Sequence, residues 1–205
     1  MTEITGRDTV CASLPSAANT ARADARSQKK VAKELGINYY DKDIIAAAAK
    51  VSYLDASVIE REGEELTAGE SFWQSITPIS YDHKEHLFEV QREVILDIAA
   101  KEPCLILGRC ADVILNEAGI DSLDVFVYAD EAHRAERVAG YIESRDLSEI
   151  VRTMKRVDRN RRAFYEHYTG QHWGACKNYT MALDSGMLGV DTCVKLICAA
   201  ARSEE

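Results

Sequence analysis

The chain has 205 residues, a length that fits one α/β domain with a modest insert. Its 46% of hydrophobic and 29% of charged residues are typical of a soluble globular protein. A net charge of −9 argues against a nucleic-acid partner, because phosphate contacts need clustered positive charge. No stretch approaches the ~18 apolar residues of a membrane span, and no secretory signal opens the sequence. We therefore expect a cytoplasmic protein that binds no membrane.

The six cysteines form no CxxC pair, and no histidine stands at metal-ligand spacing from two of them. Most lie in apolar surroundings, where a thiol acts as a small hydrophobic group. We expect reduced structural cysteines and no metal site. They are Cys11, Cys104, Cys110, Cys176, Cys193 and Cys198.

Residues 1–26 differ in composition from the remainder of the chain. The run from Ala12 to Ala21 is small and polar and has neither a helical nor an alternating apolar period. Thr9–Ala12 is the best remnant of a strand. We expect an aberrant, disordered segment over 1–26 and a domain over 27–205.

Helical and strand patterns alternate from Ser27 onward. The predicted helices cover 27–35, 41–50, much of 52–102, 111–118, 131–144, 147–168 and 190–201. The predicted strands are 37–40, 103–108, 123–129 and 178–184. Continuous apolar runs such as 103–108 are typical of strands that are buried on both faces. The alternation predicts an α/β domain whose parallel sheet is covered by helices on both faces.

The first candidate motif is Gly108-Arg109-Cys110-Ala111-Asp112, which stands where a predicted strand gives way to a helix. Ligands of open parallel sheets bind at the carboxyl ends of strands. The fork of donors on Arg109 suits a phosphate or a base edge, and Asp112 could accept from an exocyclic amine. A helix cap with a surface ion pair is the alternative.

The second motif is a basic stretch in an otherwise acidic protein. It could be a solvated helix face, or a clamp that neutralises transferring phosphates, in which Asp158 holds Arg161 or Arg162 in place. Its cations are Arg152, Lys155, Arg156, Arg159, Arg161 and Arg162.

Three further charged residues are candidates. Arg134 and Arg137 lie one turn apart on the helix after the 123–129 strand, as ligands or as a surface pair with Glu131 or Glu136. Asp41 suits a helix N-cap and could also orient a nucleotide.

A dense aromatic cluster is typical of core or dimer packing rather than base stacking. Its members are Phe164, Tyr165, Tyr168, Trp173 and Tyr179.

The ordered set of these segments over 27–205 resembles the cytidylate-kinase-like family of P-loop nucleoside-monophosphate kinases. The matching segments are 29–36, 40–45, 108–112, 125–129 with Arg134 and Arg137, 157–165, 168–170 and Trp173.

The resemblance implies a three-layer P-loop kinase-like sheet, a monophosphate-binding helical insert over about 53–90 and a lid over about 145–170. It implies ATP-dependent phosphoryl transfer with Mg²⁺ to CMP or a related nucleotide. Arg161, Arg162 and Asp158 would be catalytic, and Lys29 and Lys30 would lie on the helix after the phosphate loop. The implied substrate residues are Asp41, Arg109, Asp112, Arg134 and Arg137.

The chain departs from the family pattern at its phosphate-binding loop. The family has an apolar strand followed by a Gly-Ser-Gly-Gly-Arg type loop, whose backbone N–H groups cradle phosphates. No glycine occurs here between Gly6 and Gly36, so side chains would obstruct the phosphates. The first strand is degraded or missing in the sequence pattern, and we expect a gap in the sheet.

The neighbouring reading frame offers an explanation for the missing loop. Residues Pro15–Ser27 can be encoded by codons that also make sense in a shifted frame. When the same bases are read from the third base of the Pro15 codon, they spell Ile-Gly-Arg-Glu-Tyr-Gly-Ser-Gly-Gly-Arg-Glu-Ile. We hypothesise that residues up to about 27 are a frame-shifted translation of the family's first strand and loop.

Three functions compete at this level. The chain is a kinase impaired by its N-terminus, a non-catalytic nucleotide-binding pseudokinase, or a structural α/β protein that dimerises through its aromatic residues. For the polypeptide as given, we expect kinase activity that is absent or very low.

Overall fold

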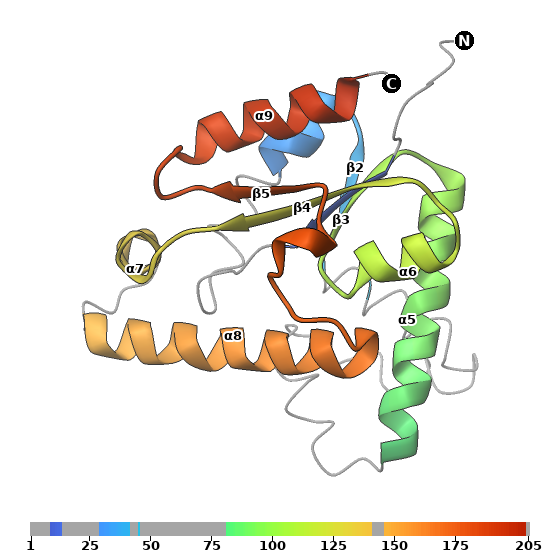
Figure 1. Cartoon of the computed structure of the whole chain (residues 1–205), viewed down its shortest axis with the longest axis horizontal. Helices are drawn as coiled ribbons and strands as arrows, with labels where there is room; N and C mark the ends of the chain where they lie inside the picture. Colours follow the sequence, from blue (N-terminus) through green and yellow to red (C-terminus); the bar gives the residue numbers. More distant parts are fainter. Residues whose placement is uncertain (1–8, 14–28, 42–44, 46–80, 141–145, 204–205) are drawn as a thin grey trace, which may run out of the picture.

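The computed structural model describes residues 9–13, 29–41, 45, 81–140 and 146–203 (Figure 1). Strands and helices alternate along these ranges as the sequence predicts. The strands are β1 Thr9–Ser13, β2 Asn38–Tyr40, β3 Cys104–Leu107, β4 Ser122–Tyr128 and β5 Met181–Asp184. The helices are a short one over 29–35, α5 Tyr81–Lys101, α6 Ala111–Glu117, α7 Glu131–Ala139, α8 Leu147–Thr169, the 3₁₀ turn η1 Cys176–Asn178 and α9 Val190–Arg202.

The five strands form one parallel sheet in the order β2-β3-β1-β4-β5. Strand β1 is its centre, with Thr9 opposite both Cys104 and Ser122. The expected gap in the sheet is therefore wrong: Thr9–Ser13 pairs on both sides, because backbone hydrogen bonds to two neighbours do not require a long apolar run. The remainder of the 1–26 segment lies outside the described residues.

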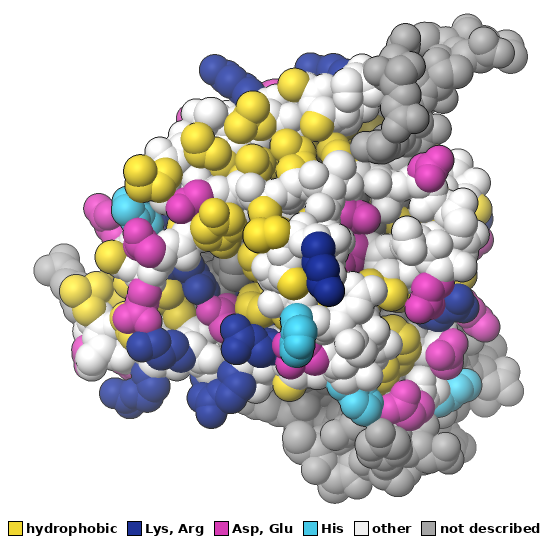
Figure 2. Space-filling model, in the orientation of Figure 1, with side chains coloured by type: hydrophobic (Ala, Val, Ile, Leu, Met, Phe, Trp, Pro, Cys, Tyr) yellow, Lys and Arg dark blue, Asp and Glu magenta, His cyan; other side chains and the backbone are white. Residues whose placement is uncertain are grey.

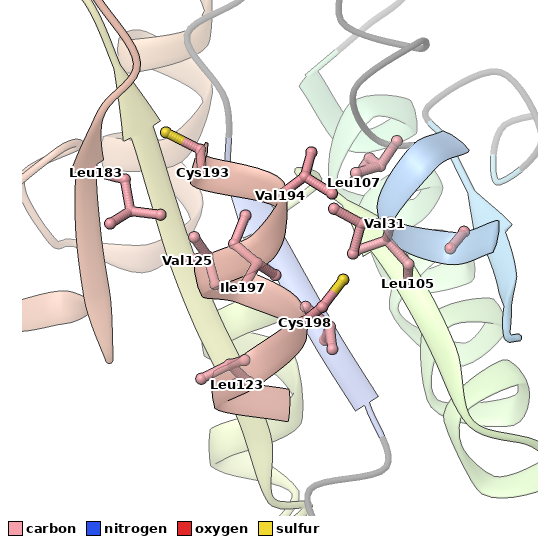
Figure 3. Close-up of a cluster of buried hydrophobic side chains, with 12 residues drawn as sticks. Val31, Leu105, Leu107, Leu123, Val125, Leu183, Cys193, Val194, Ile197 and Cys198 are labelled. Atoms are coloured by element: carbon pink, nitrogen blue, oxygen red, sulfur yellow. The ribbon is translucent and has the colours of Figure 1, made fainter. Parts of the chain in front are cut away.

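One face of the sheet is covered by α9 and the 29–35 helix (Figures 1 and 3). Leu105, Leu107, Leu123 and Val125 point to this face, as alternation along a strand requires. Figure 3 shows them beneath the inner side of α9. Its apolar side chains there are Cys193, Val194, Ile197 and Cys198.

The opposite face is covered by α5, α6 and the carboxyl-terminal part of α8 (Figure 1). Cys104 and Ile106 of β3 point to it and pack with Ile95 of α5 and Ile114 of α6. The two faces confirm the three-layer α/β architecture. Among the described helices, none combines the length and apolar character needed to cross a bilayer.

Helices α7 and α8 lie beside each other beyond the carboxyl end of β4 (Figure 1). Asp146 caps α8, because its side chain accepts from the backbone N–H groups of Ser148 and Glu149. Gly170 ends the helix at a φ of 64°, which a residue without a Cβ adopts at least cost. The expected lid over 145–170 is thus one helix along 147–169; its role as a lid stays a prediction.

The expected insert over 53–90 is described only in part. Residues 53–80 lie outside the described residues, and residues 81–90 form the first half of α5.

Candidate active site

The predicted ligand residues follow the carboxyl ends of three parallel strands. Asp41 follows β2, Arg109 follows β3, and Arg134 and Arg137 follow β4 on α7. Ser185 follows β5, and its hydroxyl accepts from Nη2 of Arg137 at 3.2 Å. Because the carboxyl ends of parallel strands lie at the same edge of a sheet, these residues all lie at that edge.

The turn between β3 and α6 has an unusual backbone. Gly108, Arg109 and Cys110 follow one another at φ values of 68°, 60° and 59°. The left-handed conformation costs a residue with a Cβ about 1–2 kcal/mol. Strain of this kind collects at functional sites, where the surrounding structure maintains it.

Arg109 and Asp112 both reach α8 from this turn. The Arg109 guanidinium lies over the ring of Phe164, 5.4 Å from its centroid, within the range of a cation–π contact. Asp112 accepts a hydrogen bond from the Tyr165 hydroxyl at 2.8 Å. Two consecutive aromatic residues of α8 therefore contact the two predicted acceptor residues.

Asp112 is a buried carboxyl group, with 4% of its surface exposed. Burial raises its pKa above the ordinary range, while the Tyr165 hydrogen bond acts in the opposite direction. Oδ2 takes the Tyr165 bond, and Oδ1 is buried without a hydrogen-bond partner among the described residues. The alternative of a surface ion pair is therefore wrong for Asp112.

A hollow of about 480 Å³ lies beside Asp112, between α6, β4 and residues 170–178. Its wall is largely polar and includes Asp112, Asn116, Asp124, Lys177 and Asn178. Arg109 does not line it. The hollow offers hydrogen-bonding groups next to the buried carboxyl group.

Asp158 forms an ion pair with Arg134, whereas the sequence predicts Arg161 or Arg162 as its partner. Oδ2 of Asp158 lies 2.7 Å from Nη1 of Arg134, and both side chains are largely buried. The reason is the packing of α7 on α8, which brings Arg134 against the inner side of α8. The interpretation of Arg134 as part of an exposed surface pair is also corrected.

The basic stretch of α8 is mainly a solvated face. Figure 2 shows Lys and Arg side chains gathered at the lower left, over α8. Arg161 is half-buried, whereas its neighbours along the stretch are exposed, and Lys155 pairs with Glu131 of α7 at 2.8 Å. The exposed members are Arg152, Lys155, Arg156, Arg159 and Arg162.

Lys29 and Lys30 contact residues of β2 and α9. Nζ of Lys30 lies 2.5 Å from Oδ1 of Asp191, and Nζ of Lys29 lies 5.5 Å from the centre of the Tyr39 ring. Residues 14–28, which would hold the phosphate loop, lie outside the described residues. The described residues therefore show no cradle for ATP phosphates, and the role of Lys29 and Lys30 stays a prediction.

Asp41 has the expected place at the start of a helical turn, since its carbonyl oxygen accepts from the backbone N–H of Ile45. Within the described ranges, no group of three or more His, Cys, Asp or Glu side chains could hold a metal ion. Four described cysteines are buried and reduced, as expected, and Cys176 is exposed.

The aromatic cluster is internal packing, as the first interpretation has it. Phe88 stacks on Tyr168 with 3.9 Å between ring centroids, and Phe126 packs against Trp173 and Tyr179. Sequence reasoning placed Tyr165 in this cluster and missed its contact with Asp112. The two residues are 53 positions apart, and no helical or strand period links them.

Solved structures with similar folds include kinases. An uncharacterized protein from Eubacterium ventriosum matches with a TM-score of 0.69 and 23% identity, over 94% of this chain and 97% of that one. A gluconokinase from Sinorhizobium meliloti matches with a TM-score of 0.51 and 11% identity, over 96% and 93%. The fold is that of the P-loop kinases.

The family model of the cytidylate kinase-like family matches residues 28–187, well over half of the sequence. The chain belongs to the cytidylate kinase-like family. A comparison with curated proteins gave no match.

Proposed function

We propose that this chain is a nucleoside-monophosphate kinase-like protein that holds CMP through Arg109 and Asp112. In this proposal, phosphoryl transfer from ATP is impaired, because residues 7–35 contain no glycine for a phosphate loop. The observation that carries the proposal is Asp112 itself. It is a buried carboxyl group beside a strained turn at the carboxyl end of β3, in a chain of this family.

Each remaining candidate residue has a role in the proposal. Arg109 binds the acceptor phosphate, and Arg161 and Arg162 stabilise the transferring phosphoryl group by charge. Asp158 acts through Arg134, which it orients from α8. Arg137 and Asp41 complete the nucleotide contacts at the same edge of the sheet. Mg²⁺ would accompany the bound nucleotide, coordinated mainly by phosphates.

Calorimetry with CMP and with ATP tests the proposal on the full chain. We expect CMP to bind, ATP to bind poorly, and Arg109→Ala to abolish CMP binding. Arg152→Ala is the matched control, because it removes an exposed arginine of α8 outside the site. Measured turnover of ATP and CMP by this chain would contradict the proposed impairment.

The competing functions predict other results. A pseudokinase binds CMP and stays unable to bind ATP after the glycine loop is restored. A structural protein binds neither nucleotide. The structure gives no support to the structural alternative, because the aromatic residues invoked for a dimer pack within one chain.

A further inference from the structure

The hydroxyl of Tyr165 donates a hydrogen bond to the Asp112 side chain, which the backbone N–H groups of Asp112 and Val113 also approach. Both residues are 4% exposed, and 2.8 Å separates the phenol oxygen from Oδ2. A carboxylate accepts through both oxygens, and buried polar atoms are almost always paired. Oδ1 of Asp112 therefore retains acceptor capacity after Tyr165 has taken Oδ2.

Tyr165 cannot easily move away from this position. Its ring belongs to the buried cluster that includes Cys110, Ala111 and Ile114, beneath α6. A hydrogen bond with Tyr179 also reaches the Tyr165 side chain. A phenol fixed in this way restricts the rotation of the Asp112 carboxyl group to orientations in which Oδ2 meets it.

We propose that Tyr165 is the positioning residue of the acceptor site, holding Asp112 so that Oδ1 accepts from the amine of a cytosine-type base. The inference rests on the proposed function. The inference adds to that function the group that selects an amine-bearing base over uracil, because uracil has a carbonyl oxygen at the corresponding position.

The chemistry of the two bases supports this selection. An amine donates to Oδ1, whereas a carbonyl oxygen would face a second acceptor and leave both unpaired in a buried site. Discrimination of this type is stronger than that of an apolar pocket. Tyr165 also opposes the effect of burial on the pKa of Asp112, which favours the ionised, accepting form.

Calorimetry with CMP and UMP on the full chain and its Tyr165→Phe variant tests the proposal. Loss of one hydrogen bond to a carboxylate should weaken CMP binding about 10-fold and change UMP binding less than about 2-fold. Tyr168→Phe is the matched control, since it makes the identical change three residues further along α8, where the ring stacks on Phe88. It should leave both affinities unchanged.

The possible outcomes separate the two claims. If Tyr165→Phe keeps the CMP-to-UMP ratio of the unaltered chain, or weakens both nucleotides equally, the positioning role is refuted while the proposed function stands. If the unaltered chain binds neither nucleotide, both fail. A titration of the Asp112 carboxyl carbon by NMR needs no nucleotide: its pKa should rise in Tyr165→Phe and stay constant in Tyr168→Phe. An unchanged pKa in Tyr165→Phe would also refute the role.

Discussion

The Arg134 guanidinium and the Asp158 carboxylate join α7 to α8 through a 2.7 Å contact, with 15% and 22% of their side chains exposed. Lys155 and Glu131 join the same two helices at 2.8 Å, but their side chains are 65% and 52% exposed. The two ion pairs have similar geometry and differ in burial. Comparing them therefore measures how much burial changes the contribution of an ion pair to the free energy of unfolding.

Asp158→Ala should destabilise the fold far more than Lys155→Ala. Removing one partner of a largely buried pair leaves the other charge without compensation, at a cost of about 1–3 kcal/mol. An exposed pair contributes about 0–1 kcal/mol. Urea unfolding of both variants measures the difference. Equal losses would mean that solvent screens the inner pair as fully as the outer one.

The buried carboxyl of Asp112 predicts a pH effect on stability. Burial raises its pKa, so between the ordinary and the raised value the folded state holds more protons than the unfolded state. Stability from this group is therefore present at low pH and is lost as pH rises through that window. Asp112→Asn cannot ionise and keeps an oxygen for Tyr165.

The difference in unfolding free energy between Asp112→Asn and the unaltered chain should consequently move in favour of the variant as pH rises above the ordinary aspartate pKa of about 3.9. Other carboxyl groups titrate equally in both chains and cancel. Urea unfolding at several pH values measures this difference. A difference that does not change with pH would show that Asp112 titrates as it does in the unfolded chain.

The strands with long apolar runs could be predicted from the sequence to within about three residues. The predicted 123–129 strand is Ser122–Tyr128, because residues buried by two helical layers must be apolar at nearly every position. The predicted 178–184 strand begins only at Met181, since Cys176–Asn178 forms a 3₁₀ turn. Strand β1 gave too weak a pattern, as its pairing depends on the backbone of β3 and β4.

The site could be predicted residue by residue but not contact by contact. Arg109 and Asp112 are recognisable at the end of an apolar run. Their partners Phe164 and Tyr165 are more than fifty positions away, and a helical period cannot say against which helix an aromatic face packs. The ion pair of Asp158 with Arg134, in place of the predicted Arg161 or Arg162, was missed for the same reason: the sequence does not show which helix packs against α8.

Tyr40 should ionise at unusually high pH. Its hydroxyl donates to Oε1 of Glu102 at 2.5 Å, and this bond, with burial and the negative charge, raises the pKa of Tyr40 to about 12. Glu102→Gln removes the charge and should lower the pKa toward the ordinary value of 10.0. Absorbance at alkaline pH follows the phenolate, and Tyr40→Phe identifies the step. An unaltered titration in Glu102→Gln would contradict this assignment.

The coding DNA should carry a single-base insertion or deletion near codons 27–28. The family match begins at residue 28, where the hypothesis of a shifted frame ends the aberrant segment. Restoring the frame replaces residues 15–27 with the glycine loop read from the neighbouring frame, while the described helix over 29–35 continues unchanged. Backbone N–H groups in a glycine-rich loop could then approach the phosphates.

We expect the restored chain to bind ATP, measured by calorimetry, and to phosphorylate CMP, measured by a coupled assay. In the restored chain, Arg161→Ala and Arg162→Ala should lose turnover, while Arg152→Ala should retain it. If no such indel opens a frame with the loop, the hypothesis fails; if the restored chain binds CMP but never ATP, the protein is a nucleotide-binding pseudokinase.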